Sequence, residues 1–291
     1  PDFAVPSLNA ILNSKHTISA VVTNTDKEQG RGKKVAFSPI KQFALQQGLK
    51  VIQPEKFKDE KFIKELIDIN PDVFIVVAFK ILPKEVFLIP KYGSFNLHGS
   101  LLPKYRGAAP IQWALINGDK ETGLTTFFLK ETVDTGNIIL TKHIEINDDD
   151  NFGSLHNKMS IEGANLIIET LEKIENGNLD LKAQEDAHSS SAPKITKETC
   201  LLNVNKDAIL LHNQVRGLSP VPGSVLEINS KNYKIFKTKA LKEPFVEMGN
   251  IKTTKNEIFL GCMNSTLQIL EIQPEGRRRM LAEEFLRGYK F

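Results

Sequence analysis

The sequence predicts an α/β domain with a doubly wound, parallel-rich sheet, followed by a small β-barrel. Helix and strand patterns alternate through the first two thirds of the 291 residues, as they do in doubly wound sheets. Residues 73–78 read VFIVVA and are apolar at every position, which is typical of a central parallel strand covered on both faces. After residue 181, a polar, proline-bearing stretch precedes several short alternating strands.

Spacing and capping residues place the elements of the N-terminal part. Ser38 is a suitable N-cap, Pro39 suits the first position of a helix, and Gly48 suits its end. Apolar residues at helical intervals and β-branched runs place the neighbouring elements. The expected elements are a helix at 5–12, a strand at 17–22, a helix at 39–48, a strand at 50–52 and a helix at 56–69.

The same signals continue through the rest of the chain. Gly118 closes a short helix that begins at Pro110, and a long helix with periodic apolar residues ends near Gly177. Short apolar runs bounded by turn residues predict strands. The expected strands are 124–129, 138–146, 223–228, 233–236, 257–260 and 267–272.

The sequence pattern changes near residue 181 and predicts three segments. Residues 1–181 carry the α/β pattern, and residues 198–291 carry the short strands of an OB-like β-barrel. Residues 182–197 between them are polar and contain the run HSSSAP, which suits an exposed linker.

Composition narrows the class of protein. A chain that is 41% hydrophobic and 25% charged should fold with a core, and its formal charge of +3 neither requires nor excludes a polyanionic partner. Cys200 and Cys262 lie far apart and the six histidines have no paired spacing, so neither a disulfide framework nor a metal site is predicted. No apolar run approaches the ~20 residues of a membrane span. We expect a cytoplasmic protein.

Polar side chains are presented at a strand end in the stretch FNLHGSLLP, residues 95–103. Asn96 and His98 share one face because alternate residues of a strand point the same way. In doubly wound sheets ligands bind beyond the carboxyl ends of the strands, where these side chains would lie. Simpler interpretations stay open: His98 alone is compatible with a structural histidine, and Asp134 in its VDTG turn with an Asx-type turn residue.

Four segments together resemble the 10-formyltetrahydrofolate-dependent formyltransferases. They are NLH at 96–98, GSLLP at 99–103, YRGAAPIQ at 105–112 and DTG at 134–136. The resemblance covers almost the whole chain and extends to the methionyl-tRNA formyltransferases within that group. It implies a Rossmann-like catalytic domain and an OB-like second domain that binds tRNA.

The resemblance also implies roles for individual residues. Asn96, His98 and Asp134 correspond to the catalytic trio, and the SLLP segment corresponds to part of the site for the co-substrate 10-formyltetrahydrofolate. That segment consists of Ser100, Leu101, Leu102 and Pro103. One departure concerns the N-terminus, because the family starts with a strand and this chain opens just after it. We therefore expect a first strand to be missing upstream.

The trio also makes chemical sense for formyl transfer. An amine attacks the formyl carbon directly and forms a tetrahedral intermediate with negative charge on oxygen. The amide of Asn96 and a protonated His98 can donate hydrogen bonds to that oxygen. Asp134 beside His98 would favour the imidazolium and help to relay the proton that the amine loses. Neither a metal nor a covalent enzyme intermediate is required.

A basic loop indicates which amine accepts the formyl group. Residues 27–34 read KEQGRGKK, and taken alone such a charge cluster is compatible with a merely solvated loop. The resemblance implies instead that Arg31, Lys33 and Lys34 contact the acceptor stem of initiator Met-tRNA. Basic residues elsewhere could extend this surface: residues 276–279 (GRRR), Lys194, Lys197 and Arg216.

The predicted function is therefore formylation of the methionine α-amino group on initiator Met-tRNA by a monomeric enzyme. Two alternatives stay open at this point. The chain could formylate a small amine, either a sugar nucleotide or glycinamide ribonucleotide, or it could be a catalytically silent RNA-binding relative.

Overall fold

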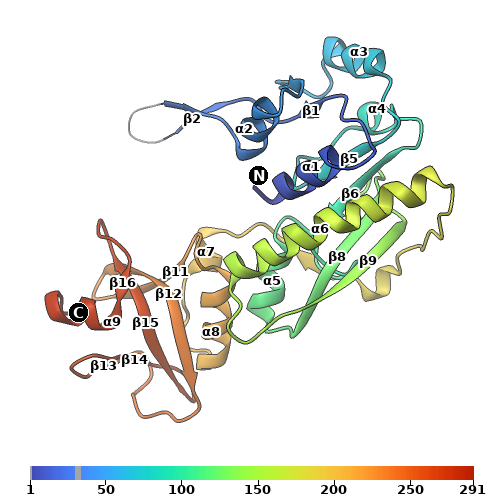
Figure 1. The fold of residues 1–291 in the computed structure, drawn as a ribbon. Coiled ribbons are helices and arrows are strands. Elements are labelled where there is room, and N and C mark those ends of the chain that lie inside the picture. Colours follow the sequence, from blue (N-terminus) through green and yellow to red (C-terminus); the bar gives the residue numbers. More distant parts are fainter. Residues whose placement is uncertain (1, 30–33) are drawn as a thin grey trace. The chain divides into compact units, whose positions relative to one another are not determined.

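The computed structural model describes residues 2–29 and 34–291 (Figure 1). The chain divides into two compact units. The first unit consists of Pro1–Gly107, Gly123–Ile144 and Asn157–Ser191, and the second of Ala108–Thr122, Glu145–His156 and Ala192–Phe291. Both units therefore combine segments that are distant in the sequence.

The N-terminal part of the first unit packs two helices beside a short parallel sheet. A 3-10 turn (Asp2–Ala4) leads into α1 (Val5–Leu12), and β1 (Val21–Val22) pairs in parallel with β4 (Val51–Ile52). Helix α2 (Pro39–Gln46) begins as predicted, because the Ser38 side chain accepts from the Lys41 backbone N–H and proline occupies the first turn. The small core here contains Ala4, Leu8, Val21, Ile40 and Ala44.

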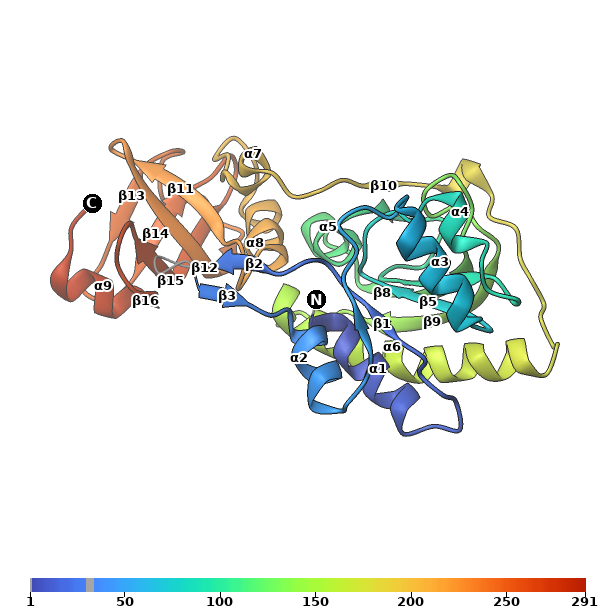
Figure 2. The ribbon, with the colours of Figure 1, turned by 90° about the horizontal axis from the view of Figure 1, so that it is seen from above.

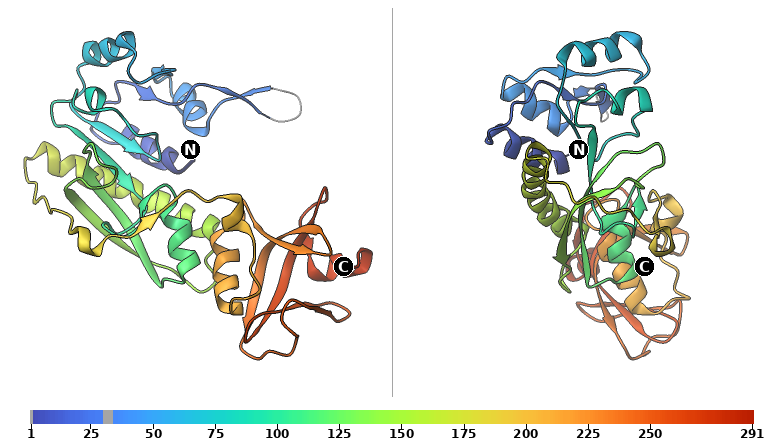
Figure 3. Two further views of the ribbon diagram at one scale, coloured as in Figure 1. Left: turned by 180° about the vertical axis from the view of Figure 1, so that it is seen from behind. Right: turned by 90° about the vertical axis from the view of Figure 1, so that its right-hand side faces the viewer.

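A β-hairpin leaves this part of the first unit between β1 and α2. Its strands are β2 (Lys27–Gln29) and β3 (Lys34–Ala36), and they pair antiparallel. Figure 3 shows the hairpin extending from the part of the unit that contains α2. Arg31 and Lys33 lie outside the described residues.

A four-stranded sheet forms the other part of the first unit, in the order β5-β6-β8-β9. Strand β5 is parallel to β6, and β6 is antiparallel to β8. Long helix α6 packs closely on this sheet, because a Cβ added to Gly163 would lie 2.6 Å from the Leu97 side chain. The elements are α3 (Glu60–Ile69), β5 (Phe74–Val77), α4 (Lys84–Phe87), β6 (Ser94–His98), β8 (Glu121–Phe128), β9 (Ile138–Glu145) and α6 (Phe152–Glu175).

The parallel-rich α/β architecture is confirmed, with two local differences. Within the described ranges β5 is an edge strand, and Phe74, Ile75 and Val77 are only half-buried, so the prediction of a strand covered on both faces was wrong there. Helix α3 begins at Glu60, later than predicted, because the side chain of Asp59 caps it by accepting from the Lys61 N–H. The first strand expected upstream stays a prediction.

Residues 182–197, which the sequence predicts to be an exposed linker, contain regular structure. They include a 3-10 turn (Asp186–His188) and β10 (Ser191–Ala192), which pairs with β7 (Arg106–Gly107). Figure 2 shows the chain after α6 turning back toward β10. The boundaries at residues 181 and 198 stay a prediction.

The second unit is built on a curled antiparallel half-barrel, which confirms the OB-like prediction. Its strands run in the order β11-β12-β15-β14-β13, with β16 paired to β15. Their bounds are β11 (Ser224–Ile228), β12 (Lys231–Leu241), β13 (Ile251–Thr253), β14 (Ile258–Gly261), β15 (Thr266–Pro274) and β16 (Met280–Leu281). Helices α5 (Pro110–Asn117), α7 (Lys197–Cys200), α8 (Ala208–Gly217) and α9 (Ala282–Gly288) belong to the same unit.

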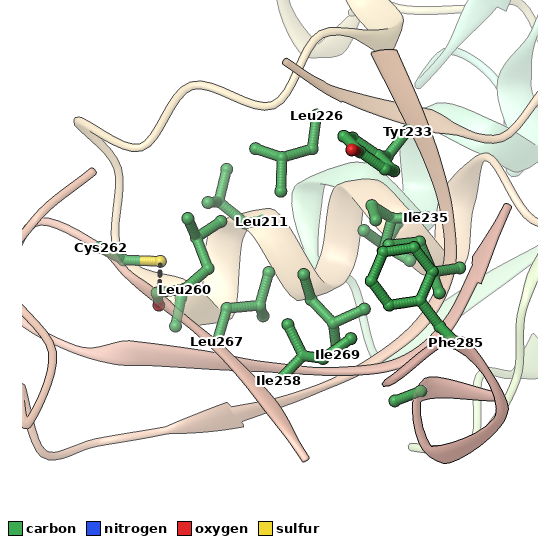
Figure 4. Packing of buried hydrophobic residues seen from close by; sticks show 14 of the residues in the cluster. Leu211, Leu226, Tyr233, Ile235, Ile258, Leu260, Cys262, Leu267, Ile269 and Phe285 are labelled. Carbon is green, nitrogen blue, oxygen red and sulfur yellow. Dashed lines mark hydrogen bonds between the residues drawn. The ribbon is translucent and has the colours of Figure 1, made fainter. Parts of the chain in front are cut away.

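The core of the half-barrel is closed by a helix that the sequence pattern did not predict. Leu211 and Val215 of α8 pack against Ile235, Leu267 and other apolar side chains of the sheet (Figure 4). The helix was missed because its ten residues also bury polar side chains, which blurs the apolar period. Among the helices that the structure describes, none is both long enough and apolar enough to cross a membrane.

Candidate active site

Strand β6 places Asn96 and His98 on one face, as predicted. Asn96 lies opposite Val76 of β5 and Phe127 of β8, and His98 lies opposite Thr125 at the carboxyl end of the strand. The side chain of Asn96 is half-buried and makes no hydrogen bond to any residue that the structure describes. An amide at a strand end without a protein partner is available to a ligand.

The ring of His98 has a defined orientation. Its Nε2 lies 2.8 Å from the backbone oxygen of Tyr105, and because a carbonyl can only accept, Nε2 carries a proton. The other nitrogen, Nδ1, lies 3.8 Å from Oδ2 of Asp134. The side chains of His98 and Asp134 are only 7% and 13% exposed. Nδ1 is therefore the nitrogen that can exchange a proton, and a carboxylate lies close to it.

The carboxylate of Asp134 is held by backbone geometry as well as by hydrogen bonds. Asp134 has a φ of 54°, in the left-handed region that aspartate tolerates better than most residues. Its Oδ2 accepts from the Gly107 N–H at 2.8 Å. Two residues later Gly136 is required, because a Cβ there would lie 1.5 Å from the backbone oxygen of Phe128. The turn thus directs the carboxylate toward His98.

The segment from Ser100 to Pro103 is a tightly held loop beside this pair. Ser100 Oγ donates to the Lys104 carbonyl at 2.6 Å, and the side chain of Leu102 packs in a small core with Phe127. Leu101 and Pro103 are half-exposed. The side chains of Ser100 and Leu102 therefore support the loop. Leu101 also packs closely on β8, because a Cβ added to Gly123 would lie 2.4 Å from its side chain, and the exposed parts of Leu101 and Pro103 can contact a ligand.

Thr125 was not singled out from the sequence, although it anchors this loop. Its Oγ1 donates to the Ser100 carbonyl at 2.7 Å and accepts from the Leu102 N–H at 3.1 Å. No signal in the sequence separates Thr125 from the other threonines of β8, which reads ETGLTTFF, because its place opposite His98 follows only from the strand register.

The other basic residues predicted for a tRNA surface have different environments. Lys34 begins β3. Arg278 and Arg279 of the GRRR run pair with Glu284 and Glu271. Arg216 is 7% exposed and donates to the backbone oxygens of residues 147 and 150, so its proposed contribution to an RNA surface was wrong. A helix that faces the core buries even a charged side chain when carbonyls are available to accept from it.

Within the described part of the chain, no group of three or more His, Cys, Asp or Glu side chains could hold a metal ion. The arrangement instead offers a hydrogen-bond donor from Asn96, a titratable ring and a carboxylate. Donors and a proton carrier at one point suit the transfer of an acyl-type group.

Comparison with known proteins agrees with this chemistry. The family model "Formyl transferase" matches residues 1–171, and "Formyl transferase, C-terminal domain" matches residues 194–290. The methionyl-tRNA formyltransferase of Thermodesulfovibrio yellowstonii is 49% identical over 291 residues, which cover 100% of this chain and 94% of the relative. The methionyl-tRNA formyltransferase of Caldanaerobacter subterraneus subsp. tengcongensis is 44% identical, covering 99% of this chain and 94% of the relative.

Solved structures share the fold at lower identity. The sugar 3N-formyl transferase WlaRD superposes with a TM-score of 0.69 at 23% identity, covering 95% of both chains. HypX from Aquifex aeolicus gives a TM-score of 0.68 at 17% identity, covering 100% of this chain and 46% of HypX. Because both family models match in order and the relatives align over their whole shared length, the chain belongs to the formyl transferase family.

Proposed function

We propose that the protein transfers the formyl group of 10-formyltetrahydrofolate to the α-amino group of methionine on initiator Met-tRNA. The observation that carries the chemistry is the placement of the unpartnered Asn96 amide and the His98–Asp134 pair at the end of β6. The choice of Met-tRNA as acceptor is supported by the names of relatives that are 44% and 49% identical over nearly the whole chain.

Each residue at this site has its own role when the amine attacks the formyl carbon. A free α-amino group has a pKa near ~8, so much of it is already neutral and nucleophilic at physiological pH. As the new C–N bond forms, Asn96 and the protonated Nδ1 of His98 donate to the formyl oxygen. The bond between the formyl carbon and N10 then breaks, and the proton lost by the amine replaces the formyl group on N10. Asp134 stabilises the imidazolium during this exchange.

The loop of residues 100–103 forms one wall of the proposed folate site. Leu101 and Pro103 are half-exposed and offer apolar contact, while buried Ser100 and Leu102 keep the loop in place. The fit rests on the half-buried amide of Asn96, which makes no hydrogen bond within the described residues and so can bind a ligand.

Acceptor binding is assigned to the β2–β3 hairpin and its connecting residues. Arg31, Lys33 and Lys34 would neutralise phosphates of the acceptor stem, which makes binding sensitive to salt. A monomeric state and a cytoplasmic location stay predictions, as does the division into residues 1–181, 182–197 and 198–291.

One assay separates this function from its rivals. The protein is incubated with 10-formyltetrahydrofolate and, in turn, with Met-tRNA, glycinamide ribonucleotide and an amino-sugar nucleotide, and formyl transfer is followed. We expect transfer to Met-tRNA, with a KM for tRNA that rises steeply with salt. Transfer only to a small amine would overturn the acceptor, and no transfer at all would favour a silent relative.

Two histidine variants provide the matched control. His98→Gln should lower kcat by about 10²-fold or more, the usual loss when a positioned proton donor is removed. His143→Gln changes an exposed side chain on β9, outside the segments that contact the His98–Asp134 pair, and should leave kcat unchanged.

A further inference from the structure

A glutamine outside the predicted trio contacts the turn that carries Asp134. Within residues 181–191 every residue is exposed except Gln184, which is half-buried. Its Nε2 donates to the backbone oxygen of Asp134 at 2.9 Å and to that of Gly136 at 2.8 Å. One side-chain amide therefore bridges the two ends of the three-residue turn.

The other end of this amide is fixed by Arg106. Its Nε and Nη2 donate to Gln184 Oε1 at 3.0 and 2.8 Å, and its Nη1 pairs with Asp186 at 2.8 Å. Arg106 can only donate and the two turn carbonyls can only accept, so the amide of Gln184 has one possible orientation. The guanidinium thus orients the donor that holds the turn.

The same network also reaches His98. Tyr105, whose carbonyl accepts from His98, donates its own N–H to Ser190 Oγ at 2.9 Å. Arg106 N–H donates to the Ser190 carbonyl at 2.8 Å, and Gly107 N–H donates to Asp134 Oδ2. Residues 105–107 therefore contact both members of the His98–Asp134 pair, and the segment at 184–190 holds them from outside.

We propose that Gln184 is a positioning residue for formyl transfer, which holds the Asp134 turn so that its carboxylate stays beside Nδ1 of His98. The inference rests on the proposed function, because it assigns Asp134 a part in the reaction. Gln184 touches neither His98 nor the reacting atoms, and it acts through the turn. Because Nδ1 and Oδ2 are 3.8 Å apart without a direct hydrogen bond, their spacing depends on the backbone around them.

Two variants test this role. Gln184→Met keeps the side-chain length and removes all four hydrogen bonds. Gln184→Glu keeps the acceptor for Arg106, removes the two donors and turns a carboxylate oxygen toward the two carbonyls of the turn. Both should lower kcat by about 10- to 100-fold, the range expected when a reacting group is misplaced by about 1 Å. The KM for each substrate should change little, because the turn is not assigned to binding.

The chain offers a matched control in Gln214. Its Nε2 also donates to two backbone oxygens, of Thr199 at 2.8 Å and of Leu201 at 2.9 Å, but in the second unit. Gln214→Met and Gln214→Glu should lower thermal stability without the loss of kcat. A Gln214 variant that loses as much kcat as its Gln184 counterpart would show that the effect is general destabilisation, and would overturn the proposal.

A double-mutant cycle asks whether Gln184 acts through Asp134. Asp134→Asn should lower kcat by itself, and adding Gln184→Met should lower it no further, because the carboxylate to be positioned is already gone. Losses that multiply in the double variant would overturn the proposal.

Amide hydrogen exchange over residues 130–137, measured without substrate, completes the test. We expect faster exchange in both Gln184 variants and wild-type exchange in the Gln214 variants. Unchanged exchange in the Gln184 variants would overturn the proposal even if kcat fell. The two proposals can fail separately. If the wild-type protein transferred no formyl group to Met-tRNA but exchange was faster in the Gln184 variants, the proposed function would be wrong, and the conclusion that Gln184 stabilises the turn would remain.

Discussion

Replacing Asn96 should affect catalysis but not the stability of the fold. Its half-buried side chain makes no hydrogen bond within the described residues, so truncating it removes no protein contact of that kind. We expect Asn96→Ala to lower kcat by about 10²- to 10³-fold, as when one donor to a developing oxyanion is lost. The melting temperature should hardly change.

The measurement for Asn96 combines steady-state kinetics with thermal unfolding. Asn178→Ala, at an exposed surface position, is the control for the chemical change. Normal turnover by Asn96→Ala would remove the amide from the mechanism.

Cys262 provides a residue-scale prediction in the second unit. The thiol is 1% exposed, and burial raises its pKa from the ordinary value of 9.0 to about 11. The unfolded chain therefore loses this proton at lower pH than the folded protein does. The stability that the protonated thiol contributes is complete below pH 9 and is lost between pH 9 and about 11.

Chemical unfolding across that pH range measures this effect. Wild type should lose more unfolding free energy than Cys262→Ala between pH 8 and 11, by about 3 kcal/mol at most for a shift of this size. Parallel curves for the two proteins would contradict the shifted pKa, and other groups that titrate at high pH cancel in the comparison.

At the scale of elements, the β2–β3 hairpin is held at both of its bases by Lys41 of α2. Lys41 Nζ lies 2.5 Å from Asp26 Oδ2, just before β2, and 4.0 Å from the ring centroid of Phe37, just after β3. It also donates to Gln53 Oε1 at 2.6 Å. The hydrogen bond from Lys41 lowers the pKa of Asp26, which favours the charged form of this carboxylate.

Lys41→Met should therefore loosen the hairpin without touching the catalytic pair. We expect faster amide exchange in β2 and β3 and a higher KM for Met-tRNA, with the KM for folate unchanged. Lys50→Met is the matched control, since Lys50 pairs with Glu65 on the surface with its side chain 51% exposed. A raised folate KM in Lys41→Met would argue against a role confined to the hairpin.

Elements with strong local signals were predicted well. Ser38, Pro39 and the apolar spacing defined α2, and Pro110 with Gly118 defined α5, because capping and φ preferences act within a few residues. The segment around Gln184 was predicted only as a linker. Its polar composition is the same whether its side chains face water or bind a turn 50 residues away in the chain.

At the scale of the whole molecule, the packing of α5 on α8 joins segments that are far apart in sequence. A Cβ added to Gly217 of α8 would lie 2.7 Å from the Ile116 side chain and 3.0 Å from the Gln112 carbonyl. The close approach of the two helices therefore needs glycine. This contact explains why Ala108–Thr122 belongs to the same compact unit as the half-barrel.

Gly217→Ala should push these helices apart and lower the free energy of unfolding by about 1–3 kcal/mol, the usual cost of overpacking. Gly288→Ala is the control, because nothing lies within 4 Å of the added Cβ. Urea unfolding of the three proteins gives the comparison. Equal stability of Gly217→Ala and wild type would show that the helices adjust without strain.

The sequence by itself determined the two-part architecture, and it supplied the candidate residues of the site. Asn96, His98 and the loop of residues 100–103 are neighbours in the chain, and strand geometry alone places the first two on one face. The resemblance to formyltransferases then singled out Asp134 and the basic residues before α2.

Only the tertiary structure decided which atoms meet. It directed Nδ1 of His98 toward Asp134, assigned Thr125 and Gln184 to the support of the site, and placed Arg216 in the interior. The physical reason is that a hydrogen bond between residues 25 to 85 positions apart leaves no periodicity in the chain. Such partners are selected by the packing of sheets and helices, which local propensity does not encode.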